Sequence, residues 1–234
     1  MTEDEFQAEE PAEYTSPACS MHQVDPSYMG VQVTDSLSKE IATWRTTERE
    51  RLFALRIAAT NAERVSFVFA ISNVLDEILG DIAGKSVAAY WPFLGAPDLR
   101  GWMPATAAAG GVRLLPVIVA MKEPLEFRPW NIGEKLHRGL WNIPVPVAGK
   151  SIRPDIVIAP LVGFDSACYR LGYGGGFFDR TIAAFTPTPV IIGVGYSFQK
   201  LPTIKPHVHD IPMDVIVTEN GAFRRVPDCR PHPR

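Results

Sequence analysis

The sequence has few cysteines and lacks the features of a membrane-spanning or secreted protein. Its 234 residues contain three cysteines, Cys19, Cys168 and Cys229, which form neither a zinc-ligand pattern nor a disulfide framework. There is no run of 18 apolar residues, so we expect no transmembrane helix and no membrane partner. The first residues are acidic, whereas a signal peptide needs a basic start and an apolar stretch. These absences predict a cytoplasmic protein.

The sequence also has no excess of positive charge. Lys and Arg total 23 against 26 for Asp and Glu, which gives a formal net charge of −3. This balance argues against a generally basic nucleic-acid coat, and we expect no nucleic-acid partner. Hydrophobic residues make up 46% and charged residues 21% of the chain, as is typical of a globular protein with one or two domains.

Composition divides the chain into three parts. Residues 1–35 combine acidic residues and prolines with few periodic apolar positions, which predicts a mobile N-terminal extension. Residues 36–223 are expected to form a single α/β domain. Residues 224–234 are basic and proline-rich, which predicts a loose C-terminal tail.

The hydrophobic pattern predicts an α/β fold with a mostly parallel sheet. Helical spacing begins near Ser36, a capping box is expected at Thr60–Glu63, and a second helix over 65–82 should end at Gly84. Short apolar runs that are typical of buried strands follow. The expected strands are residues 86–90, 112–119, 125–130, 155–159, 190–196 and 215–218, with a helix over 177–185 after the fourth strand.

The most informative segment is the glycine-rich stretch 170–180, which lies between an expected strand and an expected helix. Glycines remove side chains, so that backbone N–H groups and a helix N-terminus can approach an anion. Arg170 and Arg180 flank the stretch and would add full positive charges. The glycine spacing is neither that of a Walker A motif nor that of a dinucleotide-binding loop. We interpret the stretch as an anion site, and a tight strand-to-helix turn is the alternative.

Two aspartates stand where they could serve such an anion site. Asp179 ends the glycine-rich stretch, and Asp210 precedes the last expected strand. Carboxylates beside bound phosphates suit Mg²⁺, which prefers oxygen ligands. A helix acid that is stabilised by the helix dipole is the alternative for Asp179.

Residues 160–180 resemble the signature of the 5-formyltetrahydrofolate cyclo-ligase family, which is also called methenyltetrahydrofolate synthetase. Four further blocks are similar to that family in the same order, and together the resemblance covers roughly residues 40–220. They are Tyr90-Trp91-Pro92-Phe93 with Asp98, residues 124–130, residues 139–146, and His209-Asp210 through Glu219.

The resemblance implies a Rossmann-like three-layer domain with an N-terminal helical segment, and an ATP- and Mg²⁺-dependent ligase of one-carbon metabolism. Such an enzyme closes 5-formyltetrahydrofolate to 5,10-methenyltetrahydrofolate and releases ADP and phosphate. The implied partners are a folate substrate and ATP, and a monomer or homodimer is expected. Because phosphate is a better leaving group than an amide oxygen, this chemistry needs positioning and charge neutralisation more than a protein nucleophile.

The resemblance also implies the roles of individual residues. ATP would contact a basic pair on one helix face, where the family usually has Lys first, together with the glycine-rich stretch. These ATP residues are Arg45, Arg49, Arg170, Leu171, Gly172, Tyr173, Gly174, Gly175, Gly176, Phe177 and Phe178. The substrate would contact Ala96, Tyr173, Gly174, Gly175, Gly176 and Phe177. Asp179 and Asp210 would hold Mg²⁺, and catalysis would depend on Arg170 and on Phe178, which replaces a family tyrosine.

The sequence departs from the family pattern on the folate side. Ala96 and Val145 stand where the family has glutamates, and Phe178 stands where it has tyrosine. A glutamate can pair with the amino edge of a pterin and a phenol can donate a hydrogen bond, whereas Ala, Val and Phe cannot. Two alternatives to an active cyclo-ligase therefore stay open. One is a paralogue that binds ATP and acts on another substrate, and the other is a non-catalytic binding protein.

Overall fold

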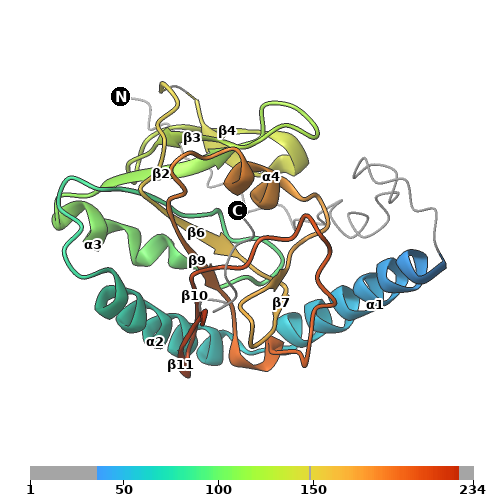
Figure 1. Cartoon of the computed structure of the whole chain (residues 1–234). Helices are drawn as coiled ribbons and strands as arrows, with labels where there is room; N and C mark the ends of the chain where they lie inside the picture. Colours follow the sequence, from blue (N-terminus) through green and yellow to red (C-terminus); the bar gives the residue numbers. More distant parts are fainter. Residues whose placement is uncertain (1–35, 148, 227–234) are drawn as a thin grey trace, which may run out of the picture.

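The computed structural model describes residues 36–147 and 149–226, and within these ranges the largest sheet has seven strands (Figure 1). Its strands are β1 (Ser86–Ala88), β2 (Val112–Val117), β3 (Glu126–Pro129), β6 (Ile156–Pro160), β9 (Val190–Val194), β10 (Val215–Thr218) and β11 (Gly221–Arg224). They lie in the order β11-β10-β9-β6-β1-β2-β3. The inner strands pair in parallel, and the edge strands β3 and β11 are antiparallel to their neighbours. The predicted α/β class with a mostly parallel sheet is confirmed.

Two helices precede the sheet, as the periodicity predicts. They are α1 (Ser36–Ala58) and α2 (Asn61–Leu79). The expected capping box is present: the Thr60 hydroxyl accepts from the Glu63 N–H, and the Glu63 carboxylate accepts from the Thr60 N–H. The prediction that α2 runs to residue 82 is wrong. Gly80 adopts a left-handed φ of +54° and its N–H bonds to the Asp76 carbonyl, which ends the helix there.

Helices cover both faces of the sheet, which gives three layers (Figure 1). On one face, α2 and α3 (Met103–Ala108) contribute Ile71, Leu75 and Met103 to a core with alternate residues of the strands. On the opposite face, α4 (Phe177–Ala183) contributes Phe177 and Ile182. Strands β6, β9 and β10 are buried on both sides along almost their whole length, which explains why they read as continuous apolar runs.

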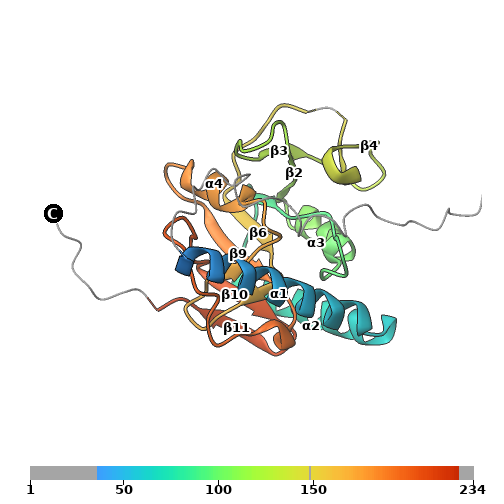
Figure 2. The same ribbon diagram turned by 90° about the vertical axis from the view of Figure 1, so that its right-hand side faces the viewer.

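Helix α1 packs outside these two cores, against segments that follow the strands. Figure 2 shows α1 and α2 following one another along the same side of the molecule. Leu52 of α1 is fully buried in a separate cluster with Val162, Leu171, Leu201 and Ile204. This packing brings one face of α1 to the loops at the end of β6 and after β9.

Short elements without a clear periodicity complete the described chain, and most of them were not predicted. Two small hairpins pair β4 (Leu136–Arg138) with β5 (Pro144–Pro146) and β7 (Gly163–Phe164) with β8 (Arg170–Leu171). Three short 3₁₀ turns span Leu99–Gly101, Leu140–Asn142 and Ser197–Gln199. The predicted extension 1–35 and most of the predicted tail lie outside the described residues, although Arg224 belongs to β11.

The strand order fixes where a ligand can bind. Numbered along the chain, the parallel strands β1, β2, β6, β9 and β10 lie in the order 2-1-3-4-5, which is a doubly wound arrangement. In such sheets the chain leaves in opposite directions from two neighbouring strands, here β1 and β6, and a crevice opens at their carboxyl ends.

No described helix is both long and apolar enough to cross a membrane.

Candidate active site

A pocket opens at the carboxyl ends of β1, β2 and β6, where the strand order predicts a crevice. Tyr90 and Trp91 follow β1, Pro116 and Ile118 lie at the end of β2, and Pro160 ends β6. The pocket volume is about 1130 Å³ when the open mouth is included. This size is ample for a small-molecule ligand.

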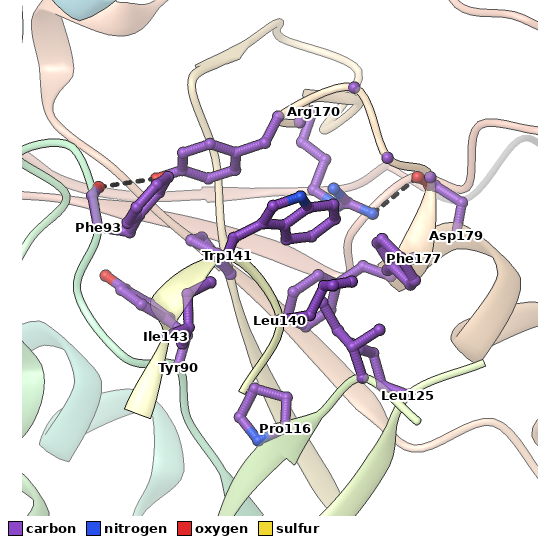
Figure 3. A pocket seen from close by; sticks show the side chains of 18 of the residues that line it. Tyr90, Phe93, Pro116, Leu125, Leu140, Trp141, Ile143, Arg170, Phe177 and Asp179 are labelled. Atoms are coloured by element: carbon purple, nitrogen blue, oxygen red, sulfur yellow. Dashed lines mark hydrogen bonds and ion pairs between the residues drawn. The ribbon is translucent and has the colours of Figure 1, made fainter. Parts of the chain in front are cut away.

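The lining residues divide into a charged end and an apolar end. Arg170 and Asp179 lie on one side of the pocket, and Tyr90 and Pro116 lie on the other, with Trp141 between them (Figure 3). We define the charged end as Arg45, Arg49, Arg170, Asp179, Asp210 and the glycine loop 172–176. We define the apolar end as Tyr90, Trp91, Phe93, Pro116, Ile118, Leu125, Leu140, Trp141, Ile143, Val145, Phe177 and Phe178.

The glycine loop connects β8 to α4, and its shape requires glycine at particular positions. Gly174 has a φ of +102°, which L side chains rarely adopt. A Cβ atom on Gly172 would lie 2.7 Å from a guanidinium nitrogen of Arg170. The tight-turn alternative for these glycines therefore describes part of their role, because the loop does bend sharply.

Two arginines hold the carbonyl groups of the glycine loop. Arg49 Nε donates to the Gly172 carbonyl at 2.8 Å, and an Arg180 nitrogen donates to the Gly175 carbonyl at 2.5 Å. Among the hydrogen bonds of the described residues, none has a backbone N–H of residues 172 to 176 as its donor. The Gly176 carbonyl accepts from the Arg180 N–H, so the loop offers donors to a ligand while three of its acceptors are already occupied.

Arg170 and Asp179 form a largely buried ion pair at this end. An Arg170 nitrogen lies 2.8 Å from Asp179 Oδ2, and the Arg170 side chain is 4% exposed. Asp179 Oδ1 accepts a hydrogen bond from the Ile211 N–H at 3.2 Å. The Arg170 guanidinium also lies over the Phe178 ring, 5.4 Å from its centre. These contacts hold both charged groups in fixed positions on the pocket wall.

Arg45 and Asp210 form a second ion pair, which joins α1 to the segment after β9. Arg45 also donates to the carbonyls of Ile204 at 3.2 Å and Lys205 at 2.9 Å. Asp210 Oδ2 accepts from the His207 N–H at 2.6 Å. The two aspartates that the sequence singles out therefore line one pocket, and each is bonded to an arginine.

Arg49 differs from the other two arginines of the charged end. The ion pairs of the described residues include Arg45 and Arg170 but not Arg49. Burial, with the nearby positive charge of Arg45, lowers the pKa of the Arg49 guanidinium to about 10, so it stays protonated at neutral pH. In the described part of the chain, the charged end thus has three arginines and two aspartates on its wall, and this excess of positive charge favours an anionic ligand.

The apolar end is built from packed rings and aliphatic side chains. Trp141 meets Phe177 edge to face with ring centres 5.4 Å apart. The Tyr90 hydroxyl donates to the Pro97 carbonyl at 2.8 Å, and burial raises the pKa of this phenol well above its usual value. Both lining carboxylates belong to the charged end, so this end suits a flat, largely apolar ring system.

The structure brings together almost all the residues that the sequence predicts for the site. Every predicted ATP residue, both aspartates, and Val145 line the pocket. Ala96 is the exception: it is 6% exposed, belongs to the core between α2, α3 and the sheet, and is not among the lining residues. A side chain at position 96 therefore does not face this pocket.

Sequence reasoning missed two groups of residues around the pocket. The first group is the apolar wall. Pro116 and Ile118 belong to no motif, while Leu125 and residues 140–143 lie in family-like blocks without having been assigned to the site. Arg56 was also missed, although it follows Arg45 and Arg49 on the same face of α1. That helical spacing was a signal that a third arginine would point toward the site.

Comparisons with known proteins agree with this geometry. The model of the 5-formyltetrahydrofolate cyclo-ligase family matches residues 41–219. A 5-formyltetrahydrofolate cyclo-ligase of Mycolicibacterium smegmatis is 28% identical over 145 residues, which cover 58% of this chain and 75% of that protein. One of Mycoplasma pneumoniae is 38% identical over 65 residues, which cover 28% of this chain and only 39% of that relative. The solved structure of Aquifex aeolicus 5,10-methenyltetrahydrofolate synthetase superposes with a TM-score of 0.69 and 28% identity, covering 81% of this chain and 96% of that one.

Proposed function

Because the chain belongs to the 5-formyltetrahydrofolate cyclo-ligase family, we propose that it closes 5-formyltetrahydrofolate to 5,10-methenyltetrahydrofolate with ATP, releasing ADP and phosphate. The observation that carries the proposal is the division of the pocket. One end has three arginines against two aspartates, beside loop amides that no hydrogen bond among the described residues uses, and the other end is apolar and aromatic. This is the arrangement that a polyphosphate and a flat ring system would need side by side.

The charged end would bind the phosphates of ATP. Arg49 supplies the positive charge that is not yet neutralised, and the N–H groups of residues 172–176 supply directional donors. Arg45 and Arg170 would extend this set, since charge-assisted hydrogen bonds to phosphate are among the stronger polar contacts. In the proposed reaction the formyl oxygen takes the γ-phosphoryl group, a nearby amine nitrogen of the substrate attacks the formyl carbon and loses its proton, and the oxygen departs with phosphate. Arg170 and the loop would stabilise the charge that develops on the transferred group.

Asp179 and Asp210 fit a magnesium ion that is held jointly with phosphates. Both are oxygen donors on the wall of one pocket, and Mg²⁺ commonly uses one or two carboxylates together with substrate phosphates. Among the described residues there is no group of three or more His, Cys, Asp or Glu side chains that could hold a metal ion. The phosphates would therefore be needed to complete the site. When bound, the ion would neutralise charge on the phosphates, and the aspartates would orient it.

The apolar end would take the folate, and it supports a second candidate function as well. Val145 lines the pocket where the family usually has glutamate, and Phe178 lines it where the family has tyrosine. Burying the amino edge of a pterin without an acceptor is unfavourable. This observation favours, as the alternative, a paralogue that binds ATP but closes or phosphorylates another substrate. The cytoplasmic location and the monomeric or dimeric state stay predictions of the sequence.

Methenyl formation tests the proposal directly. The protein would be mixed with 5-formyltetrahydrofolate, ATP and Mg²⁺, and the absorbance of the methenyl product followed. Calorimetric titration with a non-hydrolysable ATP analogue would be run beside it. Product formation supports the cyclo-ligase function, and nucleotide binding without product favours the second candidate. A protein that neither binds the analogue nor forms product would contradict both.

A further inference from the structure

Arg56 is a charged residue that the fold buries completely. Its side chain is 0% exposed, and the ion pairs of residues 36–147 and 149–226 do not include it. Arginine is almost never fully buried without a carboxylate partner, because removing its charge from water is unfavourable. The hydrogen bonds that the Arg56 guanidinium makes must therefore offset the cost of burying its charge.

The guanidinium of Arg56 joins three segments of the pocket wall to α1. Its Nη1 donates to the Tyr173 hydroxyl at 2.9 Å and lies 3.4 Å from the Leu94 carbonyl oxygen. Its Nη2 donates to the Leu161 carbonyl, directly after β6. A single planar group thus ties the glycine loop, the turn after β1 and the end of β6 together. Lysine has one nitrogen in place of this fork and could not satisfy all three.

Tyr173 is the residue on which this network converges. Its hydroxyl accepts from Arg56 and donates to the Phe93 carbonyl at 3.2 Å, the bond that Figure 3 draws at Phe93. The Tyr173 ring lies between Phe53 and Phe93, with ring centres 5.7 and 5.9 Å away. Hydrogen bonds therefore hold the Tyr173 hydroxyl, and ring contacts hold its ring. Tyr173 and Phe93 both line the pocket.

The turn after β1 depends on the same arginine. Leu94 has a φ of +48° and Gly95 a φ of +69°, so this turn contains two consecutive left-handed residues. A Cβ atom on Gly95 would lie 3.4 Å from the Cβ of Arg56. A non-glycine residue in this conformation is held by its surroundings. Arg56 contributes to both positions, because its guanidinium lies by the Leu94 carbonyl and its backbone lies by Gly95.

We propose that Arg56 is a positioning residue that sets the pocket wall formed by Tyr173 and Phe93. It does not line the pocket itself and acts through these two residues. Arg49, which binds the glycine loop one residue earlier at Gly172, makes no use of Arg56. Arg56 should therefore affect the binding of the formyl-bearing substrate more than that of ATP, because Arg49 still holds the loop at Gly172. The kinetic part of this inference rests on the proposed cyclo-ligase function.

The experiment compares Arg56→Met, Arg56→Lys and Tyr173→Phe with the double variant Arg56→Met/Tyr173→Phe. Arg56→Met should raise the KM for 5-formyltetrahydrofolate about 10- to 100-fold, because small displacements of a substrate-positioning group have effects of this order. The KM for ATP should rise clearly less than that. Arg56→Lys should restore part of the loss, and the double variant should be no worse than Arg56→Met. Equal rises in both KM values, or additive effects in the double variant, would overturn the proposal.

Arg64→Met is the matched control. Arg64 donates to the carbonyls of Arg56 and Ile57 at the end of α1 and is not among the pocket-lining residues. Its replacement removes an arginine from the same region and should leave both KM values unchanged. If Arg64→Met reproduced the KM change of Arg56→Met, general destabilisation would explain the result and the proposal would be wrong.

Hydrogen–deuterium exchange separates this inference from the proposed function. Amide exchange in segments 90–97 and 170–178 should be faster in Arg56→Met than in the parent, and unchanged in Arg64→Met. A parent without methenyl formation would contradict the proposed function, while the exchange data would still decide the role of Arg56. Unchanged exchange in both segments of Arg56→Met would overturn the inference on its own.

Discussion

The two ends of the pocket are held in shape by different forces. At the charged end, Arg45 and Arg170 each bond an aspartate, and Arg49 bonds a loop carbonyl, so direction and distance are fixed by polar contacts. At the apolar end, rings such as Trp141 and Phe177 pack against one another without such bonds. A ligand at the charged end must match a pattern of charges and donors. A ligand at the apolar end must match a shape.

The two ends of the pocket therefore distinguish between ligands in different ways. A misplaced phosphate at the charged end loses charge-assisted hydrogen bonds, which are among the stronger polar contacts. A ring with one polar group more or fewer changes the fit at the apolar end far less, since hydrophobic pockets discriminate weakly between similar shapes. The charged end therefore defines the proposed nucleotide, and the apolar end admits a class of flat substrates.

Removing the Arg170 guanidinium should have the largest effect on stability, because it breaks the buried ion pair with Asp179 at the charged end. Arg170→Met would leave the mostly buried carboxylate of Asp179 with the Ile211 amide as a partner. We expect the free energy of unfolding in urea to fall by about 3 kcal/mol. Asp179→Asn, which removes the charge and keeps the shape, should spare folding yet reduce turnover. A parental unfolding curve for Arg170→Met would show that the ion pair does not hold this end together.

Replacing Arg49 should weaken nucleotide binding at the charged end without lowering the stability of the fold. Arg49→Met removes an arginine that forms no ion pair within residues 36–147 and 149–226, so folding should be retained while the ATP analogue with Mg²⁺ binds more weakly. The expected loss of about 1.5–3 kcal/mol corresponds to roughly 10- to 100-fold in Kd measured by calorimetry.

Arg51→Met is the control for this substitution. Arg51 lies on the same helix, is paired with Glu48, and its side chain is 50% exposed. Its replacement should leave nucleotide affinity unchanged. An equal loss of affinity in the two variants would mean that Arg49 acts through general charge and not through contact.

Phe178→Tyr would add a polar donor where the two ends meet. The Phe178 ring lines the pocket beneath the Arg170 guanidinium, and one well-placed donor can contribute about 10²–10³-fold to a rate. We expect methenyl formation to rise by about tenfold, since a new hydroxyl is less well placed than an evolved one, with no change in melting temperature. A stability loss without a gain in rate would show that the hydroxyl is buried without a partner.

The smallest expected effect is that of adding a carboxylate to the apolar end. Val145→Glu should lower the KM for 5-formyltetrahydrofolate about threefold to tenfold, because the gain of a charged hydrogen bond is reduced by the burial of the carboxylate. Ala96→Glu is the matched comparison, since Ala96 is equally buried but outside the pocket. It should destabilise the fold without changing KM. The same response from both positions would contradict the placement of Val145 on the pocket wall.

Local patterns in the sequence predicted the sheet and the helices that precede it. Strands β6, β9 and β10 are buried on both faces and appear as continuous apolar runs, and the Thr60–Glu63 capping box marks the start of α2. The end of α2 was predicted too late, because a left-handed glycine at position 80 stops the helix within an apolar stretch. The hairpin β4–β5 and helix α3 were missed because both are too short to show a period.

By itself the sequence determined that a glycine loop flanked by arginines follows a buried strand, because glycine and charge act over a few neighbouring residues. Only the tertiary structure decided which charges meet. Arg45 and Asp210 are 165 positions apart and pair because α1 packs against the segment after β9. The same packing brings Arg49 to the Gly172 carbonyl, buries Arg56 against Tyr173, and places Val145 in the pocket but Ala96 in the core. Such partnerships depend on how whole layers stack, and no local pattern of residues encodes that stacking.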